Sequence, residues 1–185
     1  MSLLIRTIGH STRPIEELLA LLKAQGILLL VDVRRFPFSP RNPQFNQQVL
    51  AESLTKAAIH YYHLPALGGR RKAHPDSLNR GWRSAGFRGY ADYMQTAEFG
   101  EALEQLMAYG KGKPTTIMCA EGVPWRCHRL LIADVLVARG WNVRHIVSKA
   151  NTEDHTLTPF AKLDHNSLTY PPPTGGDATP QLWQQ

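Results

Sequence analysis

Short apolar runs alternate along the chain with longer segments in which apolar residues recur at helical spacing. The clearest run, ILLLVDV at 27–33, is typical of a parallel strand covered on both faces. The clearest helical segment follows Ser11, Thr12 and Pro14, typical N-cap and first-turn residues, and has apolar residues at 15, 18, 19 and 22. Further strands are expected at residues 3–8, 59–64, 115–119 and 141–147, and further helices at residues 46–58, 87–96, 98–109 and 124–139.

This alternation of strands and helices predicts an α/β fold. Right-handed crossovers give a single-domain, three-layer Rossmann-like fold with a mostly parallel sheet of about five strands flanked by helices. The domain is expected to span residues 1–163, and residues 164–185, which are rich in Pro and Gly, are expected to form a disordered tail. Residues 65–86 show no clear period and are expected to form a long, mobile excursion with a binding or lid role.

The composition narrows the class of protein. A chain of 185 residues suits one domain with a sizeable core, and no apolar run approaches the roughly 20 residues that span a bilayer. The first residues, MSLLIR, lack the features of a signal peptide, and two cysteines make no disulfide framework. We therefore expect a cytoplasmic protein that does not bind a membrane.

Positive charge is concentrated in one part of the chain. The net charge is +6, but residues 34–88 hold ten Lys or Arg against two acidic residues, a local +8 that leaves the remainder at −2. Aromatic residues interleave with this segment, as is typical of a surface for phosphates and stacked bases. We therefore expect a phosphate-bearing small molecule or a nucleic acid as the partner. The alternative is a solvated basic loop region.

Polar and reactive residues follow four of the predicted strands. The groups are His10, Ser11 and Thr12; Asp32, Arg34 and Arg35; His63 with Gly68 and Gly69; and Cys119, Glu121, Cys127, His128 and Arg129. In an open α/β sheet the carboxyl ends of the strands share one edge, and ligands bind there. The sequence therefore predicts that four loops distant in sequence converge on one crevice.

The first two groups suit the binding of an anion or substrate. Ser11 and Thr12, with free backbone amides, could hold an anion at a helix start. Arg34 and Arg35 could bind phosphate by paired hydrogen bonds, with Asp32 as a further substrate ligand. Each group has a structural alternative. Ser11 or Thr12 could cap the helix, and Asp32 could form an internal ion pair with an arginine.

Candidate proton-transfer groups lie in the first and last clusters. Glu121 is a candidate general base or ligand of a sugar hydroxyl, and His10 and His128 are candidates for moving protons. Arg129 is a further candidate for substrate binding. The alternatives are that Glu121 pairs with Arg129 or Arg126 and that His10 only hydrogen-bonds a loop.

Cys119 is a candidate nucleophile, because a helix start and nearby cations lower the pKa of a thiol. The spacing argues against a phosphatase or a rhodanese, whose loops have five residues after the Cys, since Arg126 stands seven positions after Cys119. A zinc site could be assembled from Cys119, Cys127, His128 and His10, but no paired short ligand spacing supports such a site. No metal and no cofactor is therefore predicted. Buried, inert thiols are the alternative for both cysteines.

Residues 87–94 open a predicted helix with aromatic side chains at 87, 90 and 93. A helical aromatic stripe of this kind is typical of a buried core. The hydroxyl of Tyr90 could still face the crevice, and Tyr90 is therefore included among the candidate substrate-binding residues.

Together these motifs resemble those of DUF488, a widespread bacterial and archaeal family described as a domain of unknown function. The resemblance covers about residues 5–147 and implies the domain boundaries and the motif positions, but no reaction. It rests on Thr7 to Ser11, on Asp32-Val33-Arg34 with Pro37, Ser39 and Phe45, on Leu67 to Gly69, on Phe87 to Met94, and on Cys119-Ala120-Glu121 with Cys127-His128-Arg129.

Three functions fit these residues. The first is an enzyme of the hydrolase or glycosyl-transfer type that acts on a nucleotide or nucleic acid, since neither reaction needs a redox cofactor. The second is a thiol-dependent enzyme, for example for sulfur transfer, in which Cys119 would be alkylated selectively below the ordinary thiol pKa of about 8.5. The third is a non-catalytic nucleic-acid adaptor, which predicts steep salt dependence without turnover.

Overall fold

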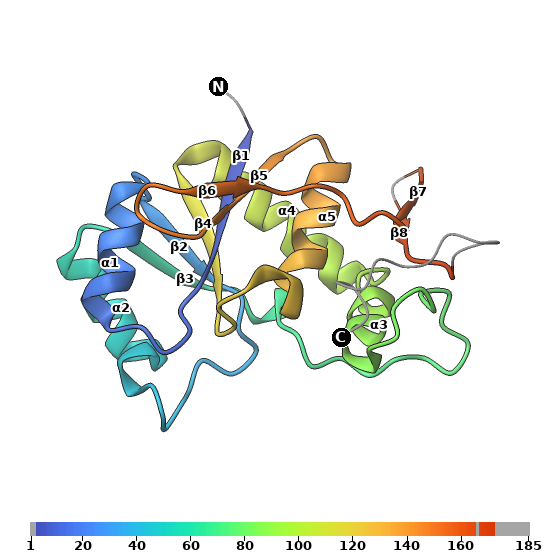
Figure 1. Ribbon diagram of the computed structural model, residues 1–185, viewed down its shortest axis with the longest axis horizontal. Coiled ribbons are helices and arrows are strands. Elements are labelled where there is room, and N and C mark those ends of the chain that lie inside the picture. Colours follow the sequence, from blue (N-terminus) through green and yellow to red (C-terminus); the bar gives the residue numbers. More distant parts are fainter. Residues whose placement is uncertain (1–2, 166, 173–185) are drawn as a thin grey trace.

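The computed structural model describes residues 3–165 and 167–172, and within them a six-stranded sheet is covered by helices on both faces (Figure 1). The strands are β1 Leu4–Gly9, β2 Leu29–Asp32, β3 His60–His63, β4 Thr115–Cys119, β5 Asn142–Ile146 and β6 Thr152–Asp154. Their order across the sheet is β3-β2-β4-β1-β5-β6. The first five strands run parallel, and β6 pairs antiparallel with β5. The predicted α/β class and mostly parallel sheet are confirmed, with β6 as an additional edge strand.

The helices form two layers around the sheet. They are α1 Ile15–Ala24, α2 Gln47–Lys56, α3 Ala85–Tyr93, α4 Ala97–Gly112 and α5 Arg129–Ala138. Helices α1 and α2 cover one face and α3 to α5 the other (Figure 1). Successive strand residues point to opposite faces, so Leu30 and Met118 pack under α1 and α2, whereas Val31 and Ile117 pack under α3 to α5. The three-layer architecture predicted from the apolar runs is therefore confirmed.

Strand β4 lies where the helices that follow the strands change from one face of the sheet to the other. The chain reaches β4 from β3 through α3 and α4 and continues into α5 on the same face. The two strands beside β4, β1 and β2, lead into α1 and α2 on the opposite face. A crevice opens beyond the strand ends wherever adjacent strands feed helices on opposite faces. Gly9 is in register with Cys119, and Asp32 with Met118, so the three strands end at one level.

The start of α1 differs from the expectation. Pro14 is the N-cap residue, and no side chain caps this helix, so the alternative in which Ser11 or Thr12 caps it does not hold. Ser11 lies instead in a turn with φ 51°. That left-handed conformation keeps Ser11 out of the helix and leaves it beside the strand ends.

The segment predicted as a long excursion is attached to the domain. Its regular structure begins with the short 3-10 helix η2 Pro65–Leu67. Farther along, the Asp92 carboxylate accepts hydrogen bonds from the His74 backbone N–H, the Ser77 hydroxyl and the Asn79 side-chain amide. These bonds hold the loop against α3, because Asp92 belongs to that helix. No helix within the described residues has the length and apolar character needed to cross a membrane.

The C-terminal segment adds to the core instead of leaving it. Strands β7 Lys162–Asp164 and β8 Ser167–Thr169 form a two-stranded hairpin. Tyr170 is fully buried against Trp82 and Phe160, and its hydroxyl donates a hydrogen bond to Asp134. The prediction of a disordered tail from residue 164 is therefore wrong for residues 167–172, because one buried aromatic side chain outweighs the polar composition around it. Residues 173–185 lie outside the described part of the chain.

Candidate functional site

A cleft of about 500 Å³ lies beyond the carboxyl ends of β1, β2 and β4. Most of the predicted site residues line it: His10, Ser11, Thr12, Arg34, Arg35, Cys119, Glu121 and His128. Loops that are distant in sequence thus meet at one concavity, as the strand-end argument predicts. Their chemical roles stay predictions.

The turn after β1 is joined to the loop after β4. The backbone N–H groups of His10 and Ser11 donate hydrogen bonds to the carbonyls of Cys119 and Ala120. A Cβ atom added to Gly9 would lie 1.7 Å from the carbonyl oxygen of Glu121, so only glycine allows the two segments to approach this closely. This close approach holds the Glu121 loop against the base of the cleft.

Arg34 lines the cleft, but its guanidinium is bound to protein groups in the wall of the cleft. The guanidinium donates to the Asp32 carboxylate at 2.6–3.1 Å and to the Phe45 carbonyl at 2.8 Å. Tyr61 donates a further hydrogen bond to Asp32, and burial together with this carboxylate raises the pKa of Tyr61. Asp32 is fully buried and Arg34 is 6% exposed. The internal ion pair, which the sequence left open as an alternative, is the arrangement the structure contains.

His10 is held in one protonation state. Its ring stacks on Phe45 with centroids 4.2 Å apart. Because an arginine N–H can only donate, the contact of Arg34 Nη1 with His10 Nε2 at 3.3 Å makes Nε2 an acceptor, and Nδ1–H donates to the Ser11 carbonyl. Burial is the main cause that lowers the pKa of His10 to about 4. His10 is therefore neutral near pH 7 and helps to hold Arg34.

The exposed cations of the cleft are Arg35 and Arg70. Both side chains are exposed and line the cleft, and Arg35 Nη1 donates to the Arg70 carbonyl at 3.1 Å. Two exposed rings, Phe36 and Phe38, stand on the same rim, and the Arg35 guanidinium lies 5.5 Å from the centre of the Phe36 ring. The sequence reasoning named Arg35 but missed Arg70, although the basic run at 70–72 was a visible signal.

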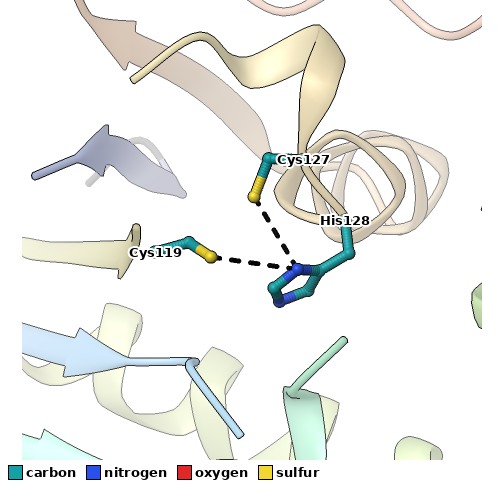
Figure 2. Close-up of side chains that lie close together, drawn as sticks. All are labelled: Cys119, Cys127 and His128. Atoms are coloured by element: carbon teal, nitrogen blue, oxygen red, sulfur yellow. Dashed lines mark hydrogen bonds between the residues drawn. The ribbon is translucent and has the colours of Figure 1, made fainter. Parts of the chain in front are cut away.

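At the base of the cleft lies a group that we call the Cys–His cluster, consisting of Cys119, Cys127 and His128. Figure 2 shows both thiols pointing toward the imidazole, with Sγ to Nδ1 distances of 3.9 Å for Cys119 and 3.7 Å for Cys127. His128 Nε2 lies 3.3 Å from the Val33 carbonyl oxygen. A carbonyl can only accept, so Nε2 carries the proton and the lone pair of Nδ1 faces the sulfurs.

The chain reaches this cluster through a break in helical structure. The helix predicted for residues 124–139 begins instead as the short 3-10 helix η3 Pro124–Arg126. Cys127 then has an extended backbone, with φ −133° and ψ 143°, before α5 begins. The extended residue redirects the chain, so Cys127 and His128 both face the end of β4.

Arg129 lies behind the Cys–His cluster, not in the cleft. It is 1% exposed and donates to Cys127 Sγ at 3.4 Å, to Thr7 Oγ1 at 3.3 Å and to the Glu121 carbonyl. Its contact with Glu121 is thus to the backbone carbonyl and not to the carboxylate. The expectation that Arg129 binds the substrate is therefore corrected, because its guanidinium is enclosed by these three acceptors.

The surroundings shift the pKa values of the two thiols in opposite directions. The hydrogen bond to Cys127 and then burial raise the pKa of Cys119 well above its ordinary value. Burial opposes ionisation of Cys127, but the hydrogen bond from Cys119 and the interactions with His128 and Arg129 outweigh it and hold the pKa of Cys127 well below its ordinary value.

Two further predicted substrate ligands lie outside the cleft. Tyr90 is 1% exposed, and its hydroxyl donates to the Leu67 carbonyl at 2.7 Å. Its ring lies 5.0 Å from the His128 ring, so Tyr90 supports the imidazole from the core side. Asp32 is enclosed by its partners as described. The placement of both residues as substrate ligands is therefore corrected, because their polar atoms already have buried partners.

Gly69 is a site residue that the sequence reasoning named only as part of a turn. It lines the cleft, and a Cβ atom there would lie 2.9 Å from His128 Nδ1. Such a distance is shorter than side-chain packing tolerates, so glycine at this position keeps the space beside Nδ1 open. The neighbouring Gly68 is similarly confined, since a Cβ atom there would lie 2.8 Å from the backbone of Arg35.

Comparison with known proteins adds one finding. A family model described as domain of unknown function DUF488 matches residues 14–136. Neither a curated protein nor a solved structure matches the chain. The matched span contains the loops after β2, β3 and β4 and all three residues of the Cys–His cluster.

Proposed function

The chain belongs to the DUF488 family, a domain of unknown function, and from that premise we propose that it is an enzyme of the hydrolase or glycosyl-transfer type. Its proposed substrate is a nucleotide or another phosphate-bearing molecule that binds in the cleft. The observation that carries the proposal is the convergence of exposed cations, exposed aromatic rings and an exposed carboxylate on a single concavity.

The rim supplies the binding groups. The guanidiniums of Arg35 and Arg70 suit a phosphate, since arginine binds it through paired, charge-assisted hydrogen bonds. The exposed rings of Phe36 and Phe38 suit a base or another flat group, since aromatic side chains stack on bases. The cleft of about 500 Å³ falls in the range of small-molecule sites.

Glu121 is the proposed general base. It is exposed and lines the cleft, and its backbone carbonyl is held by Arg129, a contact that does not involve the carboxylate. In hydrolysis the carboxylate would take a proton from the attacking water, and in glycosyl transfer from an acceptor hydroxyl. His10 is already bonded at both ring nitrogens, which favours Glu121 over His10 for this role.

Ligand-dependent melting tests the binding part of the proposal. A 5′-mononucleotide should raise the melting temperature more than the matching nucleoside or inorganic phosphate alone. At a concentration of 100 times its Kd, a ligand that binds only the folded protein adds about 2.7 kcal/mol to the free energy of unfolding. The double substitution Arg35→Ala and Arg70→Ala should weaken nucleotide binding about tenfold or more. Arg80→Ala is the matched control, because Arg80 is exposed in the same basic segment but outside the cleft lining. Equal shifts in the double variant and the control would contradict the proposal.

Once a turnover assay exists, Glu121→Gln tests the base. The substitution keeps the shape of the side chain and removes its proton-accepting charge. We expect turnover to fall by about 100-fold or more with an unchanged melting temperature, because the side chain is exposed. Full turnover in this variant would remove Glu121 from the mechanism.

One observation favours a second candidate, a thiol-dependent transfer enzyme. Cys119 lines the cleft, and its Sγ lies 3.9 Å from the unprotonated nitrogen of His128. A thiol beside a basic imidazole is the arrangement of a Cys nucleophile. If Cys119→Ser abolishes turnover while Glu121→Gln retains it, the thiol mechanism replaces the first proposal.

A further inference from the structure

We propose that the Cys–His cluster is a metal centre that binds a thiophilic divalent cation such as zinc. The ligand atoms are the Sγ atoms of Cys119 and Cys127 and Nδ1 of His128. All three lie within 4.8 Å of one another. Metal binding here stands apart from the proposed substrate, whereas the use of a bound metal in hydrolysis rests on the proposed function.

The distances within the cluster fit a tetrahedral site. With metal–sulfur bonds of about 2.3 Å and metal–nitrogen bonds of about 2.0–2.1 Å, tetrahedral angles place sulfur and nitrogen ligands about 3.5 Å apart. The two distances from His128 Nδ1 are 3.7 Å to Cys127 and 3.9 Å to Cys119. Both distances to the imidazole nitrogen are thus close to those around a tetrahedral cation, and both thiols point toward that nitrogen (Figure 2).

The surroundings orient the ligands as a metal site requires. A histidine ligand needs a free lone pair on one nitrogen and a hydrogen-bond acceptor for the other. The Val33 carbonyl is that acceptor, so Nδ1 of His128 is free to coordinate. Arg129 donates to Cys127 Sγ, which stabilises a thiolate ligand. Gly69 leaves open the space in which a larger residue would meet Nδ1.

The site would keep one coordination position open toward the cleft. Cys119 and His128 line the cleft, whereas Cys127 lies below them. His10, the fourth ligand considered from the sequence, is engaged at both ring nitrogens and is not among the clustered atoms. Three protein ligands with an open fourth position are typical of catalytic zinc, where water or a substrate oxygen completes the shell. Two thiolates would balance the charge of the cation.

The irregular spacing has a structural cause. Cys119 ends a strand and Cys127 stands eight residues later, after a loop and η3, so no short paired motif marks the ligands. The register of the sheet brings the strand end and the start of α5 together. A spacing rule that looks for ligands within one turn therefore misses this group.

Cobalt and zinc binding to the reduced, metal-free full-length chain tests the proposal. We expect one equivalent of Co²⁺ to produce thiolate-to-metal charge-transfer absorption and the visible bands of a tetrahedral site, and Zn²⁺ to displace it. Zn²⁺ should also protect both cysteines from iodoacetamide, as mapped by mass spectrometry. Competition with a chromophoric chelator should show affinity reduced about 100-fold or more in Cys119→Ser and in His128→Ala. His60→Ala is the control, because His60 is exposed on β3 and outside the cluster.

The outcomes separate this inference from the proposed function. Absence of the cobalt bands together with unprotected cysteines in the wild-type protein would overturn the metal centre, whatever the variants do. Unchanged metal affinity in folded Cys119→Ser and His128→Ala would also overturn it. If zinc binds as expected but nucleotides cause no melting shift that depends on Arg35 and Arg70, the metal centre stands and the proposed substrate class fails. If nucleotides cause the expected melting shift but zinc does not bind, the proposed substrate class stands and the metal centre fails.

Discussion

The buried ion pair beneath the cleft makes a sharp prediction about stability. Asp32 is fully buried and accepts hydrogen bonds from the backbone N–H and guanidinium of Arg34 and from the Tyr61 hydroxyl. Asp32→Asn preserves the shape of the side chain but removes its charge and turns one acceptor into a donor that faces other donors. The guanidinium, 6% exposed, then lacks its charged partner.

The magnitude follows from this loss of a charged partner. Breaking a buried pair by removing one charge costs about 3–5 kcal/mol, because the remaining charge stays desolvated. For a chain of this length each kcal/mol lowers the melting temperature by about 2–4 °C, so we expect a fall of about 6–20 °C. Asp154→Asn is the matched control. Asp154 pairs with Arg144 on the surface. The Asp154 side chain is 75% exposed and that of Arg144 is 47% exposed, so this change should cost less than about 1 kcal/mol.

Urea denaturation followed by circular dichroism measures both variants, with equal slopes required for the comparison. A double variant, Asp32→Leu with Arg34→Met, should recover much of the loss, since an apolar pair leaves no uncompensated charge. If Asp32→Asn lies within about 0.5 kcal/mol of the wild type, the pair does not carry the charge compensation that the structure indicates.

Three further outcomes are expected. Gly69→Ala places a Cβ atom 2.9 Å from His128 Nδ1, so chelator competition should show zinc affinity reduced about 10–100-fold in a folded protein. Tyr170→Ala removes a fully buried ring and its bond to Asp134, so denaturation should show a loss of about 3–5 kcal/mol, and a loss below about 1 kcal/mol would remove this segment from the core. Burial is the largest cause that lowers the pKa of His145 to about 3, so its contribution to stability is complete above the unfolded value of about 6.5 and is lost as the pH falls toward 3. This group should make the free energy of unfolding about 2 kcal/mol lower at pH 5 than at pH 7, and His145→Gln should remove that part of the pH dependence, leaving the part from His10.

The positions of the five parallel strands could be predicted from local patterns, whereas the short strands β6, β7 and β8 were not predicted. The strand expected at residues 115–119 occupies β4 Thr115–Cys119, and the run at 27–33 contains β2 Leu29–Asp32. Strands buried on both faces need apolar side chains at successive positions, and that requirement is visible in the sequence. The strand-end clusters follow from the same reasoning, since parallel strands end at one edge of their sheet. The cleft could therefore be placed before any tertiary contact was known.

Which side of the cleft wall a polar side chain occupies could not be predicted in this way. Tyr90 and Arg129 lie within the motifs that predicted the site, yet both are 1% exposed and donate hydrogen bonds to backbone or sulfur atoms behind the wall of the cleft. Tyr170 stands in a segment whose composition is that of a tail, yet it is fully buried. Burial depends on which distant elements supply packing and hydrogen bonds, and composition carries no record of those partners.

The sequence by itself determined the five parallel strands, the main helices and the edge at which reactive residues gather, because each of these follows from periodicity or from chain direction. Only the tertiary structure decided that β4 lies between β1 and β2 and that Cys127 follows η3 with an extended backbone. Those two facts bring Cys119 to His128, while Val33, just beyond β2, sets the tautomer of the imidazole. A site assembled from three separate segments depends on their relative positions in space, and the spacing of residues along one chain does not encode those positions.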